Sequence, residues 1–460
     1  MPVFSESIRI MKFFSHLNLV LLLVGCTPDF EPLAQLVEAP PKDFKEVLVF
    51  GGSNEDIAHG VIQTIDGGFA VIGNTKSNDG DFQFKTSEDS DIFVLKYDAA
   101  NQLVWAKTYG GTGDDRGYDL VELKQGGYAL IGYSSSSDGD ASRNEGMHDH
   151  WVIRTDEMGT IVWEKSFGFA GHDHAYNIIQ TPDGGLFFNG FLDVTASGGA
   201  GQDGKAFSFN RHGVGEFWAQ KIDADGNLLW RNYFGGTNND RSYDAIQTSD
   251  GNYLLVGTSE SQDVDISQPR GSYDIWVVKI SNKGKLLWER SFGGSSYDRA
   301  ASVIEHPLGN YIIVGQSLSS DGDIIQPKGN SDILLVELNN DGSQSLVKNL
   351  GGPTFDSGED LMPTKQGSIL VLGTTHSKAI EVSTNVVSET NENTATILYE
   401  LFPFKRETKT YILDGSGIEN PYALDQKQNG TVVVVGSTTS TDGLFPVSYG
   451  ETDIFIAFWN

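Results

Sequence analysis

The sequence predicts an all-β fold, a seven-bladed β-propeller of four-stranded antiparallel blades, from three observations. A pair of glycines, or a weaker version of it, recurs seven times at steps of 59, 58, 67, 58, 58 and 63 residues. Each step holds four short apolar runs between turn residues, without a helical period. One such run precedes the first unit, and the last unit ends on its third run. A four-stranded unit repeated around an axis is a β-propeller.

The fourth unit shows the repeated pattern most clearly. Its predicted strands are 240–248, 252–258, 274–280 and 285–292. Ser-Asp-Gly-Asn separates the first two strands and Ser-Asn-Lys-Gly the last two, and both have the residues that tight hairpins need. The strand at 45–50 would complete the last blade beside the strand at 455–459. The predicted propeller therefore spans residues 44–460, and its N-terminal strand closes the last blade.

The first 43 residues carry a predicted lipoprotein signal and a tether. Residues 11–26, MKFFSHLNLVLLLVGC, have a Lys, a short apolar core and the ending Leu-Val-Gly-Cys, which resembles the bacterial lipobox. Cys26 is the only cysteine of the chain and stands where lipidation needs a thiol. The sequence predicts a signal peptide at 1–25, lipidation of Cys26, a tether at 26–43 and an outer-membrane location, with the periplasmic or extracellular face left open.

Charge and cysteine content exclude several classes of function. The formal net charge is −30 and the isoelectric point is about 4.5. Nucleic-acid phosphates and anionic lipid headgroups would be repelled, so we expect no nucleic-acid partner and membrane contact only through the lipid. With one cysteine, the fold has no intramolecular disulfide and rests on burial of apolar side chains.

The repeat resembles a known family of propeller repeats. Asp-x-x-Gly-x-x-x-Trp at 223–230, Gly-Gly-x-x-x-Asp and Gly-x-Thr/Tyr-x-Ser are similar to bacterial SBBP-type β-propeller repeats of secreted and surface proteins, and more distantly to quinoprotein-like propellers. The resemblance covers residues 44–460 and implies the fold, because such repeats host unrelated activities. The chain departs from the quinoprotein pattern in having seven units instead of eight and no clustered cofactor ligands.

An acid follows each Gly pair by four residues, at the start of the first predicted strand. If that strand is innermost, seven carboxylates would surround one mouth of the central channel and could hold a cation such as calcium. The favoured interpretation is that each acid caps its own glycine-rich turn. The seven residues are Asp56, Asp115, Asp173, Asp240, Asp298, Asp356 and Glu419.

Acidic loops follow the second predicted strand in several units. Asp79-Gly80-Asp81 is the first, and similar triplets occur at 138–140, 263–265 and 321–323. These acids could bind calcium or stabilise turns. Stabilisation of turns is favoured, because a calcium site needs six to eight oxygens.

Two His-Asp-His triplets stand out among nine histidines. They place His148, His150, His172 and His174 at strand starts of neighbouring blades, on the same face. Imidazole suits zinc, so a transition-metal site is one interpretation, and solvated loop histidines are the default. Tryptophans at 105, 163, 230 and 288 share one slot of the fourth strand, which predicts packing between blades.

No nucleophile with a base and no phosphate-binding motif stands out, so the predicted function is non-catalytic. We expect an envelope scaffold, without a cofactor other than calcium, that binds a protein or glycan partner through its loop-rich face. The irregular loops at 194–213 and 378–394 are the predicted partner site. The alternative is an enzyme that acts on polysaccharide with acids at the loop-rich mouth, such as Asp173 or Asp240.

Overall fold

The computed structural model describes residues 43–202, 212–378, 393–402 and 407–460. The predicted signal peptide, Cys26 and nearly all of the tether lie outside these residues. Lys42–Asn460 form one compact unit of twenty-eight strands and one short 3-10 helix (Gly80–Phe82) among the described residues. No helix of the described residues is long and apolar enough to cross a membrane.

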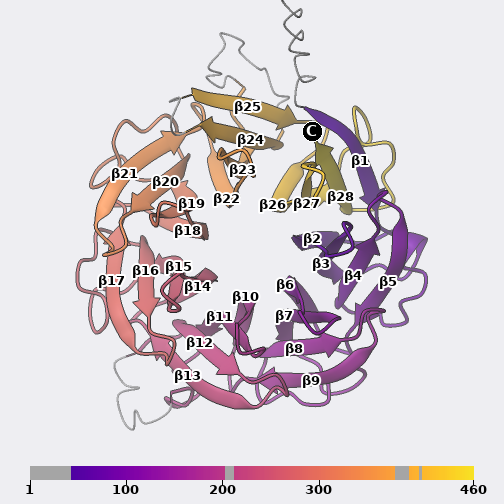
Figure 1. Ribbon diagram of the computed structural model, residues 1–460, viewed down its shortest axis with the longest axis horizontal. Coiled ribbons are helices and arrows are strands. Elements are labelled where there is room, and N and C mark those ends of the chain that lie inside the picture. The colour runs from indigo at the N-terminus through magenta and orange to yellow at the C-terminus, as the bar shows by residue number, and fades with distance from the viewer. Residues whose placement is uncertain (1–42, 203–211, 379–392, 403–406) are drawn as a thin grey trace, which may run out of the picture. The chain divides into compact units, whose positions relative to one another are not determined.

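The strands form seven four-stranded antiparallel sheets arranged around a centre, so the protein is a seven-bladed β-propeller (Figure 1). Blade 1 consists of β2 (Asp56–Gln63), β3 (Phe69–Thr75), β4 (Asp91–Tyr97) and β5 (Leu103–Tyr109). Blade 2 consists of β6 (Asp115–Glu122), β7 (Tyr128–Ser134), β8 (Asp149–Thr155) and β9 (Ile161–Phe167). Blade 3 consists of β10 (His174–Gln180), β11 (Leu186–Leu192), β12 (Glu216–Ile222) and β13 (Leu228–Phe234).

The remaining blades follow the same order. Blade 4 consists of β14 (Asp240–Gln247), β15 (Tyr253–Ser259), β16 (Asp274–Ile280) and β17 (Leu286–Phe292). Blade 5 consists of β18 (Asp298–Glu305), β19 (Tyr311–Ser317), β20 (Asp332–Leu338) and β21 (Gln344–Leu350). Blade 6 consists of β22 (Asp356–Pro363), β23 (Ile369–Thr375), β24 (Ala395–Phe402) and β25 (Glu407–Leu413). Blade 7 consists of β26 (Glu419–Gln426), β27 (Val432–Thr438), β28 (Asp453–Trp459) and β1 (Phe44–Phe50).

The closure of the propeller is as predicted. The sheet of blade 7 has the order β1-β28-β27-β26, and β1 pairs antiparallel with β28 (Figure 1). Phe44, Val47 and Phe50 of β1 are buried, so the first strand of the chain covers part of the core of the last blade. The outer edge of β28 is thereby paired, which removes an exposed template for aggregation.

The first strand of each blade is the innermost one (Figure 1). Each of these seven strands has a bulge at the same position. In β14, Ser242 pairs with Gly257 and Asp244 pairs with Val256, so Tyr243 between them has no partner. The bulge brings the Arg241 carbonyl oxygen so close to Gly257 that a Cβ there would lie 1.9 Å from it. This close contact explains why a glycine recurs in the second strand of each blade.

Tryptophans of the fourth strands pack between blades, as predicted. Trp230 and Trp288 lie against Gly284 and Gly342, which belong to the hairpin of the next blade. Trp151, Trp218 and Trp276 of the third strands are fully buried, so the core lies between adjacent sheets.

Candidate functional site

The seven acids that follow the Gly pairs are buried in their turns and do not line the channel cavity. Asp240 is fully buried, and its carboxylate accepts hydrogen bonds from the Gly236 N–H at 2.8 Å and the Ser261 hydroxyl at 2.8 Å. The other six acids are also buried and accept an N–H from their own turn. Burial raises the pKa of Asp240 to about 6. These carboxylates therefore hold the turns, and Asp173 and Asp240 present no acid at the mouth.

The acidic loops are bonded to the same turns. In blade 4, Asp263 accepts the Thr237 N–H at 3.0 Å, and Asp265 accepts the Gly235 N–H at 3.3 Å. Equivalent bonds to the first aspartate recur in blades 1, 2, 5 and 7. The carboxylates of these loops therefore stabilise the Gly-pair turns through backbone N–H groups.

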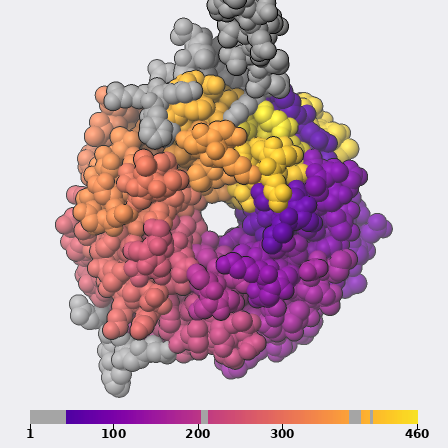
Figure 2. Space-filling view, in the orientation of Figure 1, coloured from indigo at the N-terminus to yellow at the C-terminus, as the bar shows by residue number. Residues whose placement is uncertain are grey.

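The residues that face the channel are the seven bulged ones, and the sequence interpretation missed them. All seven line a cavity of about 470 Å³ in the channel, which opens through the centre of the propeller (Figure 2). Arg299 and Asn420, one residue past the start of their strands, line the same cavity and place it toward the Gly-pair turns. From blade 1 to blade 7, the bulged residues are His59, Tyr118, Tyr176, Tyr243, Ala301, Glu359 and Tyr422.

Five of these bulged residues form a continuous aromatic arc. We use that name for Tyr422, His59, Tyr118, Tyr176 and Tyr243, which come from five consecutive blades. Neighbouring ring centroids in the arc lie 5.0, 4.7, 4.9 and 5.4 Å apart. Burial lowers the pKa of His59 to about 4, so its ring is neutral at pH 7. The arc thus presents uncharged aromatic groups on one side of the cavity.

An ion pair completes the wall of the cavity opposite the arc. Arg299 donates to Glu359 at 3.1 Å, and its guanidinium carbon lies 5.1 Å from the centroid of Tyr243. The small side chain of Ala301 leaves room between Tyr243 and Glu359. The Nε of Arg299 is buried and has no hydrogen-bond partner among the described residues. Arg299 itself lines the cavity, and the N–H groups of a guanidinium are suited to an acceptor on a ligand.

Three carboxylates lie one residue beyond the bulges, on alternate blades. Each accepts a backbone N–H from the inner strand of the next blade and so links the two blades. Burial raises the pKa of each to about 7, and each is further raised by one of the others. The acceptors and donors are Asp119 with Ile178 at 2.9 Å, Asp244 with Val303 at 2.8 Å, and Asp360 with Leu424 at 3.0 Å.

In blades 3 and 5, which lie between the blades of these acids, the residue one position beyond the bulge is a hydrogen-bond donor. Asn177 of blade 3 donates to Asp119 at 3.2 Å, and the hydroxyl of Ser302 in blade 5 bonds to Asp244 at 3.1 Å and to Asp360 at 2.9 Å. Acceptors and donors therefore alternate from blade 2 to blade 6.

The structure brings together three of the four predicted metal ligands. His148 Nδ1 lies 2.8 Å from His172 Nδ1 and 3.0 Å from His174 Nε2. His150 is separate from them, because its ring is fully buried and bonds to the Phe191 carbonyl oxygen.

The irregular loops fall partly outside the described residues, which exclude 203–211 and 379–392. The described start of the first loop folds back on its own blade, since the Gly201 carbonyl oxygen accepts the Trp218 indole N–H at 2.9 Å. The partner site predicted at these loops stays a prediction.

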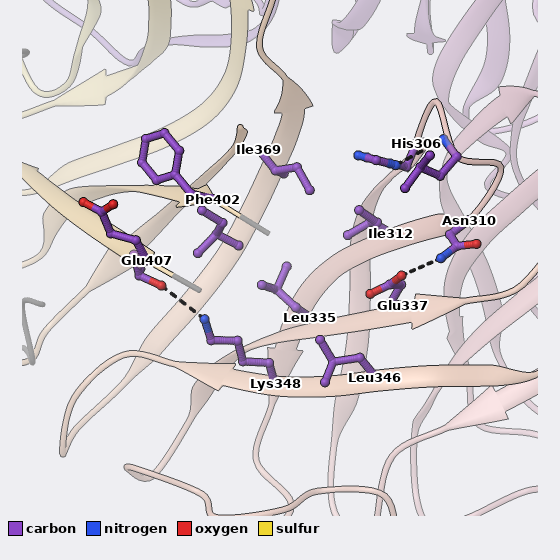
Figure 3. A pocket seen from close by; sticks show the side chains of 13 residues that line it. His306, Asn310, Ile312, Leu335, Glu337, Leu346, Lys348, Ile369, Phe402 and Glu407 are labelled. Atoms are coloured by element: carbon purple, nitrogen blue, oxygen red, sulfur yellow. Dashed lines mark hydrogen bonds between the residues drawn. The ribbon is translucent and has the colours of Figure 1, made fainter. Parts of the chain in front are cut away.

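A second cavity, of about 320 Å³, lies between blades 5 and 6 (Figure 3). Leu346 of β21 occupies the slot that holds tryptophan in the first four blades, and Ile369 faces it from the start of β23, where blades 2, 4 and 5 have tyrosine. The polar groups in the lining bond to each other, such as Asn310 to Glu337 at 2.6 Å. The cavity therefore occupies space that aromatic side chains fill in other blades.

We expect Leu346→Trp to raise the free energy of unfolding by about 1 kcal/mol, because the indole would fill this cavity as Trp288 does one blade earlier. Denaturant unfolding measures the change. Leu287→Trp is the control, because Leu287 lies on the equivalent strand of blade 4 and does not line the cavity. A loss of stability in Leu346→Trp, with Leu287→Trp unchanged, would show that the cavity does not accept an indole.

Comparisons with known proteins agree with the fold and leave the activity open. No protein-family model matches the chain. The regulatory protein FlaEY of Caulobacter vibrioides is 26% identical over 184 residues, which are 38% of this chain and 18% of that protein. This chain thus spans about a fifth of the length of that relative.

Solved structures similar to the chain have low sequence identity to it. A gluconolactonase-like protein covers 72% of this chain and 89% of its own, at 12% identity and a TM-score of 0.36. The β-propeller domain of the Trilobed protease from Pyrococcus furiosus covers 90% of this chain and 94% of its own, at 10% identity and a TM-score of 0.42. A puromycin hydrolase covers 84% of this chain and 59% of its own, at 11% identity and a TM-score of 0.40. These likenesses concern the fold alone.

Proposed function

We propose that this protein is a non-catalytic propeller of the cell envelope that binds a glycan in its central channel. One observation carries the proposal: the aromatic arc and the Arg299–Glu359 pair face each other across a cavity of about 470 Å³. Binding sites for small ligands are concave, mostly apolar, and have a few polar groups that fix orientation.

The chemistry of the lining suits a sugar chain. Aromatic faces pack against the apolar faces of sugar rings, and charged side chains bond to hydroxyl groups. Arg299 offers guanidinium N–H groups at the cavity, and Glu359 offers carboxylate oxygens. Arg116 and Arg241 stand at the same repeat position as Arg299, which favours a glycan that carries carboxylate groups.

The alternative of a polysaccharide-cleaving enzyme rested on Asp173 and Asp240 as acids at the loop-rich mouth, and the structure does not place them there. Asp173 and Asp240 are buried in their turns, and their carboxylates are engaged by backbone and hydroxyl donors. The acid that lines the cavity, Glu359, is paired with Arg299. A binding role does not require the Arg299–Glu359 ion pair to separate.

We also propose that lipidation of Cys26 holds the propeller at the outer membrane. The sequence that ends in Leu-Val-Gly-Cys and the absence of any other cysteine support this part of the proposal. Mass spectrometry of the detergent-extracted chain is expected to find a lipid on Cys26, and an unmodified Cys26 in the mature protein would contradict it.

Binding is tested on an array of bacterial envelope oligosaccharides, followed by calorimetry with the best ligand. We expect Tyr118→Ala and Arg299→Gln each to weaken binding about tenfold or more, because an aromatic contact or a charged hydrogen bond contributes about 1 to 2 kcal/mol. Tyr449→Ala is the matched control, because Tyr449 is 44% exposed and does not line the cavity. Equal affinity of wild type, Tyr118→Ala and Arg299→Gln would contradict a site in the channel.

A further inference from the structure

We propose that His148, His172 and His174 bind a divalent transition metal, with zinc as the expected ion. The three side chains come from adjacent blades: His148 precedes β8 in blade 2, His172 precedes β10 in blade 3, and His174 begins β10. One nitrogen of each ring lies within 4.8 Å of the other two. The site is independent of the proposed glycan binding.

The distances between the ring nitrogens favour a shared cation. Zinc–nitrogen bonds are about 2.0 to 2.1 Å long, so two imidazole nitrogens on one tetrahedral zinc ion lie about 3.3 Å apart. His148 Nδ1 lies 2.8 and 3.0 Å from its two neighbours, so a small shift of the side chains would accommodate the ion. A ring nitrogen offers a single hydrogen-bonding position, so His148 Nδ1 cannot satisfy both neighbours. A metal ion would serve all three nitrogens at once.

Backbone contacts fix the two loops that carry these histidines. His148 and His172 form an isolated parallel bridge, and the Asp173 N–H donates to the His148 carbonyl oxygen at 2.8 Å. Asp173 is the turn acid of blade 3 and is itself fully buried. The ligands are therefore held on a rigid frame, which a metal site needs.

The repeat provides an internal comparison for this junction. The same bridge joins blades 4 and 5, where it carries Tyr273 and Tyr297, and Arg299 there takes the position of His174. Histidines fill all three positions only between blades 2 and 3. The cluster is thus a local addition to the repeat, and packing of the blades does not require it.

Aromatic and acidic groups surround the cluster. The ring of Tyr133 stacks on His174 with centroids 4.0 Å apart and lies 4.6 Å from His148. The Tyr133 hydroxyl lies 3.3 Å from a carboxylate oxygen of Asp114. Stacking against Tyr133 restricts how the His174 ring can turn. Three histidines leave a fourth coordination position, as in catalytic zinc sites.

The test uses the full chain without a polyhistidine tag, stripped with a chelator and titrated with zinc chloride by calorimetry. We expect one zinc ion per chain, and cobalt should give the visible absorption bands of a nitrogen-ligated ion at the same stoichiometry. His172→Ala should weaken zinc binding by more than about 100-fold. Loss of a group that only hydrogen-bonds to a metal ligand already lowers metal affinity about 10- to 100-fold. His306→Ala, in a hairpin turn of blade 5, should bind like the wild type.

Circular dichroism melting establishes that the His172→Ala variant is folded, and His148→Ala gives a second, independent variant. Two results would overturn the proposal. One is a failure of the stripped wild type to bind zinc at 1:1 stoichiometry. The other is folded His172→Ala and His148→Ala variants that bind zinc as tightly as the wild type, which would place the ion on surface carboxylates.

Discussion

A chain that starts at Gly51, and so lacks β1, is expected to lose roughly 5 kcal/mol or more of its free energy of unfolding. Phe44, Val47 and Phe50 are 5%, 6% and 9% exposed in the intact propeller, and burial of such side chains contributes about 1.5 to 3 kcal/mol each. Without β1, the outer edge of β28 is also open. We therefore expect a lower melting temperature and self-association of the truncated chain.

The matched control starts at Asp43 and keeps β1 complete. It is expected to melt like the full chain, because it keeps all four strands of blade 7. Size-exclusion chromatography and thermal melting compare the two truncations. A peptide of residues 43–50, added to the chain that starts at Gly51, should restore the melting temperature. Equal stability of both truncations would show that blade 7 holds without its fourth strand.

Asp240→Ala is expected to lower the free energy of unfolding by about 3 to 5 kcal/mol, because Asp240 caps a buried turn. Its carboxylate accepts the Gly236 N–H and the Ser261 hydroxyl, and both donors are buried. A buried donor without a partner costs about 1 to 3 kcal/mol. Asp240→Asn keeps one acceptor oxygen, so we expect an intermediate loss. Denaturant unfolding measures both variants.

Asp263→Ala is the control for Asp240→Ala, because Asp263 bonds to the same turn from an exposed position. Water can replace its bond to the Thr237 N–H, so the expected loss is about 1 kcal/mol or less. Similar losses in the two variants would contradict the distinction between a buried cap and an exposed one.

The period of the sequence predicted the blades, the closure and the strand bounds to within a residue or so. The four strands predicted in unit four correspond to β14, β15, β16 and β17. This success has a physical cause: short strands between Asn, Asp and Gly turns leave few other ways to bury their apolar sides. Tryptophans in register likewise indicated packing between blades.

The lining of the channel could not be predicted in the same way, because a bulge changes which side chains face inward. Strand alternation assigns Tyr243 and Asp244 to opposite faces, and the break in register between Ser242 and Asp244 alters that assignment. Alignment of the seven units shows tyrosine or histidine at this position in five of them, which was the available signal. For the histidine cluster, the triplets indicated the residues, but only the fold separates His150 from the others.

Hydrogen-bond acceptors and donors alternate on the inner strands from blade 2 to blade 6, and this alternation cannot continue around a propeller with an odd number of blades. An alternating pattern closes on itself only around an even number of members, and the propeller has seven. The mismatch falls at blades 7 and 1, where Ala423 and Gly60 occupy the position, and there Asp425 accepts the Gln63 N–H at 2.6 Å. No rotation by one blade maps this wall onto itself. The ring of hydrogen bonds that joins the inner strands is therefore asymmetric, although the scaffold around it is built from repeats.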